Sequence, residues 1–144
     1  MKPFHASIFL ALMLLFVKTT HAAQIQLSGN DPNLVAVEFS GEIKPADFDA
    51  LRRLIEPRLS TNNSFRWFLL NSNGGDVATA MKIGRYIRTL DFDTSVASNA
   101  HCLSSCVFIF AAGNNRSTSK NNLGIHRPFR TSVGSVSRED ATKH

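Results

Sequence analysis

Three short segments of the chain carry residue types that hydrolytic chemistry uses. In the first, Gly74 and Gly75 follow an apolar segment and precede the residue pattern of a helix. Glycines in such a turn tolerate positive φ and expose backbone N–H groups, which can stabilise a developing oxyanion. The alternative is an ordinary strand-to-helix turn in which Asp76 caps the helix. Neither G-x-G-x-x-G nor a Walker lysine occurs there, which disfavours a phosphate-binding loop.

The second segment places two serines between two cysteines. Ser104 and Ser105 precede an apolar run, and at the start of a helix either hydroxyl could serve as a nucleophile or simply as a cap. Cys102 and Cys106 are four residues apart, within reach of a disulfide after local adjustment. Two free buried thiols, or part of a metal site with His101, are the alternatives. No fourth ligand is evident, so we predict no metal and no cofactor.

The third segment contains His126, in the sequence Leu-Gly-Ile-His-Arg-Pro. A histidine at a strand end can be a structural hydrogen-bonding residue. It is also the one histidine after residue 22 that is neither beside the cysteines nor at the end of the chain. His126 is therefore the candidate for a general base.

The elements expected to position these residues alternate between strands and helices. Strands are predicted at residues 34–39, 65–70, 94–97 and 123–126, and helices at 43–59 and from 76 onward. Residues 104–112 fit either a strand or a buried helix, whereas 24–33 and 114–122 read as polar connections. Alternation of strand and helix is typical of parallel βαβ units, so the predicted fold class is α/β.

The segments LLNSNGGDVATAMKIGRYI, CLSSCVFIFAAG and LGIHRPF, in this order, resemble the Clp protease proteolytic subunit within the ClpP/crotonase superfamily. More closely, they resemble exported bacterial relatives of that subunit. The resemblance covers residues 34–129 and implies stacked βαβ units. It implies a Ser104 nucleophile, a His126 base and an oxyanion hole made by the N–H groups of Gly75 and Ser105. The spacing from Gly75 favours Ser104 over Ser105 as the nucleophile.

The resemblance also implies an orienting aspartate well beyond His126, and Asp140 is a poor match for it. We therefore expect residues 23–144 to form a single, incomplete domain that is truncated at its C-terminus. Without the aspartate, peptidase activity is expected to be weak or absent. The implied substrate is a peptide or unfolded protein, and ring assembly implies a homo-oligomer. The alternative function is a non-catalytic interaction or peptide-binding module on the same scaffold. An acyl-CoA-handling crotonase fits poorly with export and with a Ser/His pair.

Residues 1–22 have the pattern of a secretory signal peptide. Lys2 precedes an apolar run at residues 8–17, which is about half the length of a membrane-spanning helix. Small residues at positions 20 and 22 predict cleavage after Ala22. We expect a periplasmic or secreted protein without a stable membrane span. No ATP-driven partner is expected there, and the cysteines would meet an oxidising compartment.

The charge pattern gives little support to nucleic-acid binding. The formal net charge is +5, but the arginines are scattered along the chain. No run of basic residues with interleaved aromatics occurs. We interpret the excess charge as a solvated face.

Overall fold

The computed structural model describes residues 23–29, 31, 33–59 and 65–126. The predicted signal peptide at residues 1–22 lies outside the described residues. So do Asp140 and the rest of the segment after His126. Within the described ranges, none of the helices has the length and apolar character needed to cross a membrane.

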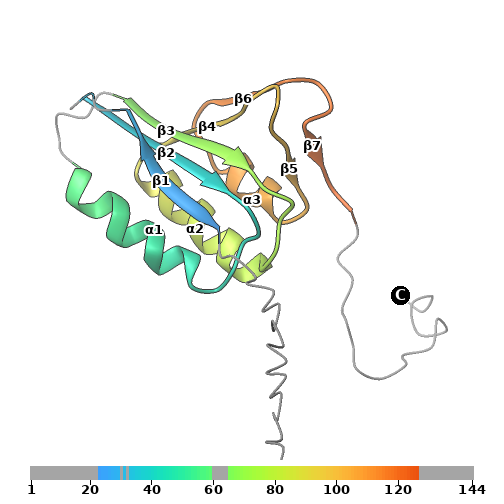
Figure 1. Cartoon of the computed structure of the whole chain (residues 1–144), viewed down its shortest axis with the longest axis horizontal. Coiled ribbons are helices and arrows are strands. Elements are labelled where there is room, and N and C mark those ends of the chain that lie inside the picture. Colours follow the sequence, from blue (N-terminus) through green and yellow to red (C-terminus); the bar gives the residue numbers. More distant parts are fainter. Residues whose placement is uncertain (1–22, 30, 32, 60–64, 127–144) are drawn as a thin grey trace, which may run out of the picture.

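The fold is built on a five-stranded mixed sheet in the order β1-β2-β3-β4-β6. Its strands are β1 (Gln24–Ser28), β2 (Leu34–Ser40), β3 (Phe65–Asn71), β4 (Asp93–Val96) and β6 (Arg116–Thr118). β1 runs antiparallel to β2, and the remaining neighbours are parallel. The predicted α/β class is confirmed by this mixed sheet and its helices (Figure 1).

In the described ranges, three α-helices and one 3₁₀ turn accompany the sheet: α1 (Asp47–Ile55), η1 (Glu56–Arg58), α2 (Val77–Thr89) and α3 (Cys106–Ala111). α1 and α2 lie along the same side of the sheet in Figure 1. In β3, Phe68 and Leu70 are buried and Leu69 between them is less so, as a sheet with one covered face requires. In β2 the consecutive residues Val35, Ala36 and Val37 are all buried. The largest fully buried side chains are Phe39, Phe68, Phe92, Ile43, Leu51, Ile55, Leu70, Ile83, Ile87 and Ile109.

The opposite face of the sheet is open at the amino-terminal ends of β2 and β3. A hollow of about 530 Å³ lies there, lined in part by Leu34, Phe65 and Trp67. Phe65 is 61% exposed and Trp67 is 41% exposed. Strand alternation explains this, because the neighbouring residue Phe68 points into the covered core and is fully buried.

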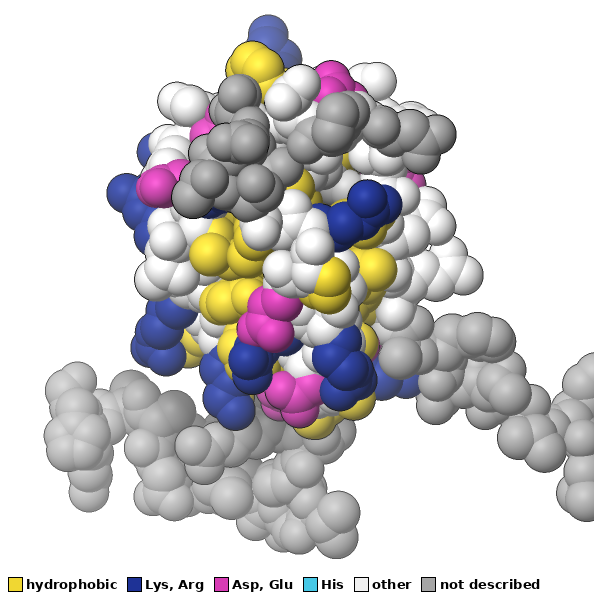
Figure 2. Space-filling view, turned by 90° about the vertical axis from the view of Figure 1, so that its left-hand side faces the viewer, with side chains coloured by type: hydrophobic (Ala, Val, Ile, Leu, Met, Phe, Trp, Pro, Cys, Tyr) yellow, Lys and Arg dark blue, Asp and Glu magenta, His cyan; other side chains and the backbone are white. Residues whose placement is uncertain are grey.

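Charged side chains of both signs lie next to one another on the surface. Figure 2 shows Lys and Arg beside Asp and Glu on one side of the molecule, around a group of hydrophobic side chains. At the C-terminal end of α1, Arg52 forms an ion pair of 2.7 Å with Glu56 of η1, at i and i+4. Such an exposed pair stabilises a helix by only a few tenths of a kcal/mol.

Two strands occur where polar connections were predicted. Residues 24–33 contain β1, in which Ile25 and Leu27 pack against the core between exposed glutamines. Residues 114–122 contain β6, whose three residues are all exposed. The predictions for both segments were wrong, because edge strands are held by backbone pairing with a neighbour and need few apolar residues. The ambiguous segment 104–112 is a tight turn followed by α3, so the helical interpretation holds.

Candidate functional site

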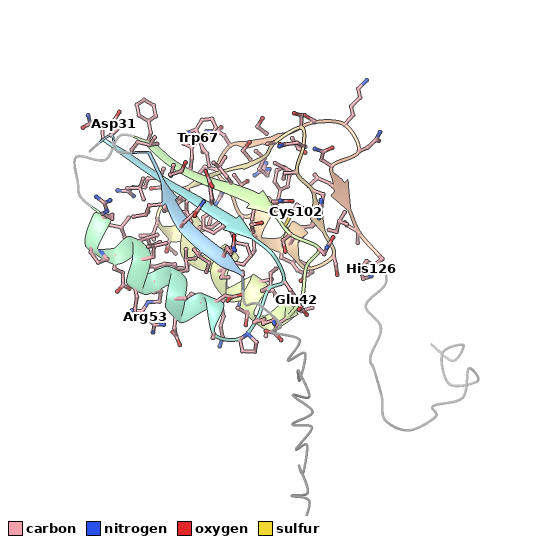
Figure 3. All side chains as sticks on the ribbon, in the orientation of Figure 1. Asp31, Glu42, Arg53, Trp67, Cys102 and His126 are labelled. Atoms are coloured by element: carbon pink, nitrogen blue, oxygen red, sulfur yellow. A yellow bond between two sulfur atoms is a disulfide. The ribbon has the colours of Figure 1, made fainter. Side chains whose placement is uncertain are left out.

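A second, two-stranded sheet brings together the segments that carry Ser104 and His126. β5 (Cys102–Leu103) pairs in parallel with β7 (Leu123–Gly124), with Leu103 opposite Gly124. The Ser104 N–H donates to the Gly124 carbonyl at 2.7 Å and extends this pairing by one residue. Figure 3 shows His126 just beyond β7, on the same side of the molecule as Cys102. Carboxyl ends of neighbouring parallel strands meet at one edge, and that edge is where these two residues lie.

Ser104 occupies the turn between β5 and α3 in a conformation that is unusual for serine. Its φ is +54°, in the left-handed region that non-glycine residues seldom adopt. Backbone strain of this kind costs on the order of 1–3 kcal/mol and clusters at functional sites. A strained strand-turn-helix is also how some hydrolases expose a nucleophilic serine. The Ser104 side chain is half-buried, and its hydroxyl makes no hydrogen bond with another described residue.

Ser105 has the opposite environment. Ser105 is 2% exposed, and its Oγ accepts from the Gly75 N–H at 2.8 Å. The same hydroxyl donates to the Gly75 carbonyl at 3.0 Å. The hydroxyl of Ser105 is therefore fully engaged, whereas its backbone N–H finds no acceptor among the described residues. The two serines thus differ in geometry: within the described residues the Ser104 hydroxyl has no hydrogen-bond partner, whereas the Ser105 hydroxyl holds the glycine turn.

The position of Gly75 differs from the sequence prediction in one respect. Its N–H was expected to point into an oxyanion hole, but the structure pairs this N–H with Ser105 Oγ. The Ser105 N–H is available as an oxyanion donor in the observed geometry. The Gly75 N–H becomes available only when its hydrogen bond with the Ser105 hydroxyl is broken. Serine and glycine are 30 residues apart in the chain, so the sequence contains no signal for this contact.

The turn that contains Gly75 is fixed by close backbone contacts on both sides. Gly75 has φ +147°, and a Cβ added there would lie 2.7 Å from the Ile43 nitrogen and closer still to the Ile43 carbonyl oxygen. The Ile43 N–H donates to the Gly74 carbonyl at 2.9 Å. On the other side, a Cβ added to Gly74 would lie 2.8 Å from the Ser104 Cβ. Only glycines allow these approaches.

Ser72 is a site-supporting residue that sequence reasoning missed. It is 1% exposed, and its Oγ donates to the Gly41 carbonyl at 2.5 Å and accepts from the Gly74 N–H at 3.0 Å. Its backbone pairs with Cys102 in an isolated parallel bridge. A serine inside the polar run NSNGG, directly after an apolar strand, was the only available signal in the sequence. Ser72 links the glycine turn to the strand that leads to Ser104.

The two cysteines form a disulfide, which decides among the three alternatives left open by the sequence. Cys102 and Cys106 are bonded with their Cα atoms 5.3 Å apart, and both residues are fully buried. No cluster of three or more potential metal ligands occurs among the described residues. The disulfide spans the turn that holds Ser104 in its left-handed conformation.

We expect the Cys102→Ala/Cys106→Ala double variant to lose about 2 kcal/mol of unfolding free energy. The loop that the bond closes is short, so the entropy removed from the unfolded chain is modest. Denaturant unfolding of the variant and the parent, both under non-reducing conditions, measures the difference. Equal midpoints, or a parent mass that does not increase on reduction, would contradict the prediction.

Asp76 caps α2, as one interpretation of the sequence anticipated. Its carboxylate accepts from the Thr79 N–H at 2.7 Å. Hydrogen bonds from the Thr79 side chain and backbone lower the pKa of Asp76 below its usual value. A lowered folded-state pKa stabilises the fold above the unfolded-state pKa, and this contribution is lost as the pH falls through the folded-state pKa.

Replacing Asp76 by alanine is expected to lower the unfolding free energy by about 1 kcal/mol at neutral pH. The Asp76→Asn variant is the matched control, because asparagine keeps an acceptor oxygen at the cap. The difference between parent and Asp76→Ala should shrink as the pH falls into the acid range, since the protonated carboxyl is a poorer acceptor. Thermal unfolding across this pH range provides the measurement, and a difference that is constant with pH would refute the cap assignment.

No family model matches the chain, and no curated protein sequence matches it.

Proposed function

We propose that this chain is an exported serine hydrolase of Clp-protease type that acts on peptides through an acyl-Ser104 intermediate. The observation that carries the proposal is the contrast between the two serines. Ser104 has a strained backbone and a hydroxyl that makes no hydrogen bond in the described part of the chain, and it lies at the strand edge that also leads to His126. The resemblance of the three segments to the ClpP/crotonase superfamily supports the same assignment.

In the proposed reaction, Ser104 Oγ attacks the peptide carbonyl carbon while His126 takes the hydroxyl proton. The Ser105 N–H then stabilises the negative charge on the carbonyl oxygen. Collapse of the tetrahedral intermediate breaks the C–N bond, and His126 returns the proton to the leaving amine. Water repeats the sequence on the acyl-enzyme and frees Ser104. Gly75 becomes a second oxyanion donor when the Ser105 hydroxyl turns away from it.

Export limits the substrates of such an enzyme to short peptides or chains that are already unfolded. No ATP is present outside the cytoplasm to drive an unfolding partner. The Cys102–Cys106 disulfide is compatible with an oxidising location. Assembly into a ring or another homo-oligomer is part of the proposal, by resemblance alone.

The second candidate function is a non-catalytic peptide-binding module on the same scaffold. It is favoured by one observation: the Gly75 N–H is already paired with Ser105 Oγ. If this pairing persists, the site keeps a single oxyanion donor. A site of this kind would bind peptides and turn over slowly or not at all.

A fluorophosphonate probe distinguishes the two functions. The processed protein is incubated with the probe, digested and mapped by mass spectrometry, after circular dichroism has verified that it is folded. The hydrolase proposal expects an adduct on the peptide that contains Ser104. A folded protein that takes up no probe overturns the hydrolase and leaves the binding module.

A further inference from the structure

Asp47, the first residue of α1, is a buried carboxylate. The residue is 2% exposed, and its Oδ2 accepts from the Lys44 N–H at 2.7 Å. Burial raises the pKa of Asp47, while hydrogen bonds from the backbone of Lys44 and of Ala23, and the charge of Lys44, act in the opposite direction. A buried carboxylate is stable only when donors or a positive charge compensate for the lost water.

The hydrogen bond from Ala23 is notable because of where this residue lies in the sequence. Ala23 is half-buried and packs against the hydrophobic core just before β1. Its Cα lies next to Gly41, where an added Cβ would be 3.5 Å away. These contacts position Ala23 where its backbone N–H donates to the Asp47 carboxylate. This nitrogen is also the atom that cleavage after Ala22 would release.

We propose that Asp47 is the binding site for the α-ammonium group of the processed chain. Hydrolysis of the bond between residues 22 and 23 adds water, leaves a carboxylate on the removed segment and gives Ala23 an amine that takes up a proton. A neutral amide donor next to Asp47 then becomes a cation with three N–H donors. Charge-assisted hydrogen bonds of this kind are roughly twice as strong as neutral ones. The inference rests on cleavage after Ala22 and is independent of the proposed hydrolase.

This ion pair would stabilise the segment that supports the glycine turn. Ile43 lies in the segment between Gly41 and Asp47. Its N–H donates to the Gly74 carbonyl at 2.9 Å, and its carbonyl accepts from the Asp76 N–H at 2.8 Å. Lys44 contributes a second positive charge near Asp47, but Glu42 shares it at 3.7 Å. The α-ammonium would be the cation that Asp47 does not share. Removal of the signal peptide would thus add a stabilising ion pair to the segment that supports the glycine turn.

The first test is the identity of the processed N-terminus. The protein is exported from a bacterial host, and its first residue is determined by mass spectrometry of the intact chain and of its N-terminal peptide. The proposal expects Ala23 as the first residue. Any other start overturns it, because the α-ammonium would then lie away from Asp47.

The second test is a cycle of two changes on the chain that starts at Ala23. The α-amino group is left free or acetylated, in the parent and in Asp47→Asn. Acetylation is expected to raise the unfolding equilibrium constant of the parent about tenfold or more and to have little effect in Asp47→Asn. Equal effects of acetylation in the two backgrounds overturn the proposal.

A third measurement does not depend on the variant folding. The α-amino group of the parent is dimethylated with a ¹³C label and titrated by NMR. Pairing with Asp47 predicts a pKa above that of the same group in the urea-unfolded chain. An unchanged or lower pKa contradicts the ion pair, whatever the outcome of the probe-labelling experiment.

Discussion

Replacing Ser104 by alanine is expected to lower the rate of covalent labelling by a fluorophosphonate by a factor on the order of 10³ or more. The probe forms a bond with an accessible, activated hydroxyl, and of the two serines only Ser104 has a hydroxyl without a hydrogen bond to another described residue. Alanine also tolerates the turn about as well as serine, because both have a Cβ at φ +54°. The loss is therefore expected without a large change in stability. Labelling rates from intact-protein mass spectrometry provide the measurement.

Ser105→Ala is the matched control for this variant. It removes the two hydrogen bonds between the Ser105 hydroxyl and Gly75, which should lower the unfolding free energy by about 1 kcal/mol. It also frees the Gly75 N–H to act as a second oxyanion donor. We therefore expect labelling that is as fast as in the parent or faster. Labelling lost in Ser105→Ala and kept in Ser104→Ala would exchange the roles of the two serines and refute the proposed mechanism.

Replacing Gly75 by alanine should be the most damaging single substitution for stability, with a loss of about 3–5 kcal/mol. The new Cβ would overlap the backbone of Ile43, which cannot move like a flexible side chain. The residue must also keep φ +147° or rebuild the turn. Either adjustment disturbs the pairing with Ser105. Denaturant unfolding monitored by circular dichroism measures the loss.

Gly29→Ala provides the control for backbone strain without steric overlap. Gly29 has φ +82°, but the nearest atom to an added Cβ is Leu34 Cδ2, at 3.8 Å. We expect this variant to lose about 1–2 kcal/mol, the cost of a left-handed residue that has a side chain. Equal losses at the two glycines would show that the contact with Ile43 is not what requires glycine at position 75.

The elements with strong periodicity were predictable from sequence, and the edge strands were not. β2, β3 and α2 contain strong apolar patterns, because each packs against the same core. β1 and β6 lack such a pattern. In β1, Gln26 donates to Glu38 of the neighbouring strand β2 at 2.7 Å, and such polar residues give β1 the composition of a loop when it is read alone. β1 and β6 are held by backbone pairing with β2 and β4, and this pairing cannot be read from the local sequence.

The candidate site was predictable in its residue types but not in its contacts. The order of glycine turn, serine pair and histidine can be read directly along the chain. The positive φ of Ser104 and the buried state of Ser105 cannot, because both follow from packing against a turn 30 residues away. Sequence spacing alone therefore could not separate the free hydroxyl from the engaged one. It also could not foresee that the Gly75 N–H already has a partner.

The open hollow on the sheet gives the protein an intrinsic optical reporter. Trp67 is the only tryptophan of the chain, and it lies at this hollow with 41% of its surface exposed. An indole in that position emits at long wavelength and is accessible to a collisional quencher such as iodide. When another surface covers the sheet, the emission should shift to shorter wavelength and quenching should fall. Because Trp67 lies on β3, whose end leads into the glycine turn, one fluorophore can follow both coverage of this face and unfolding of the site.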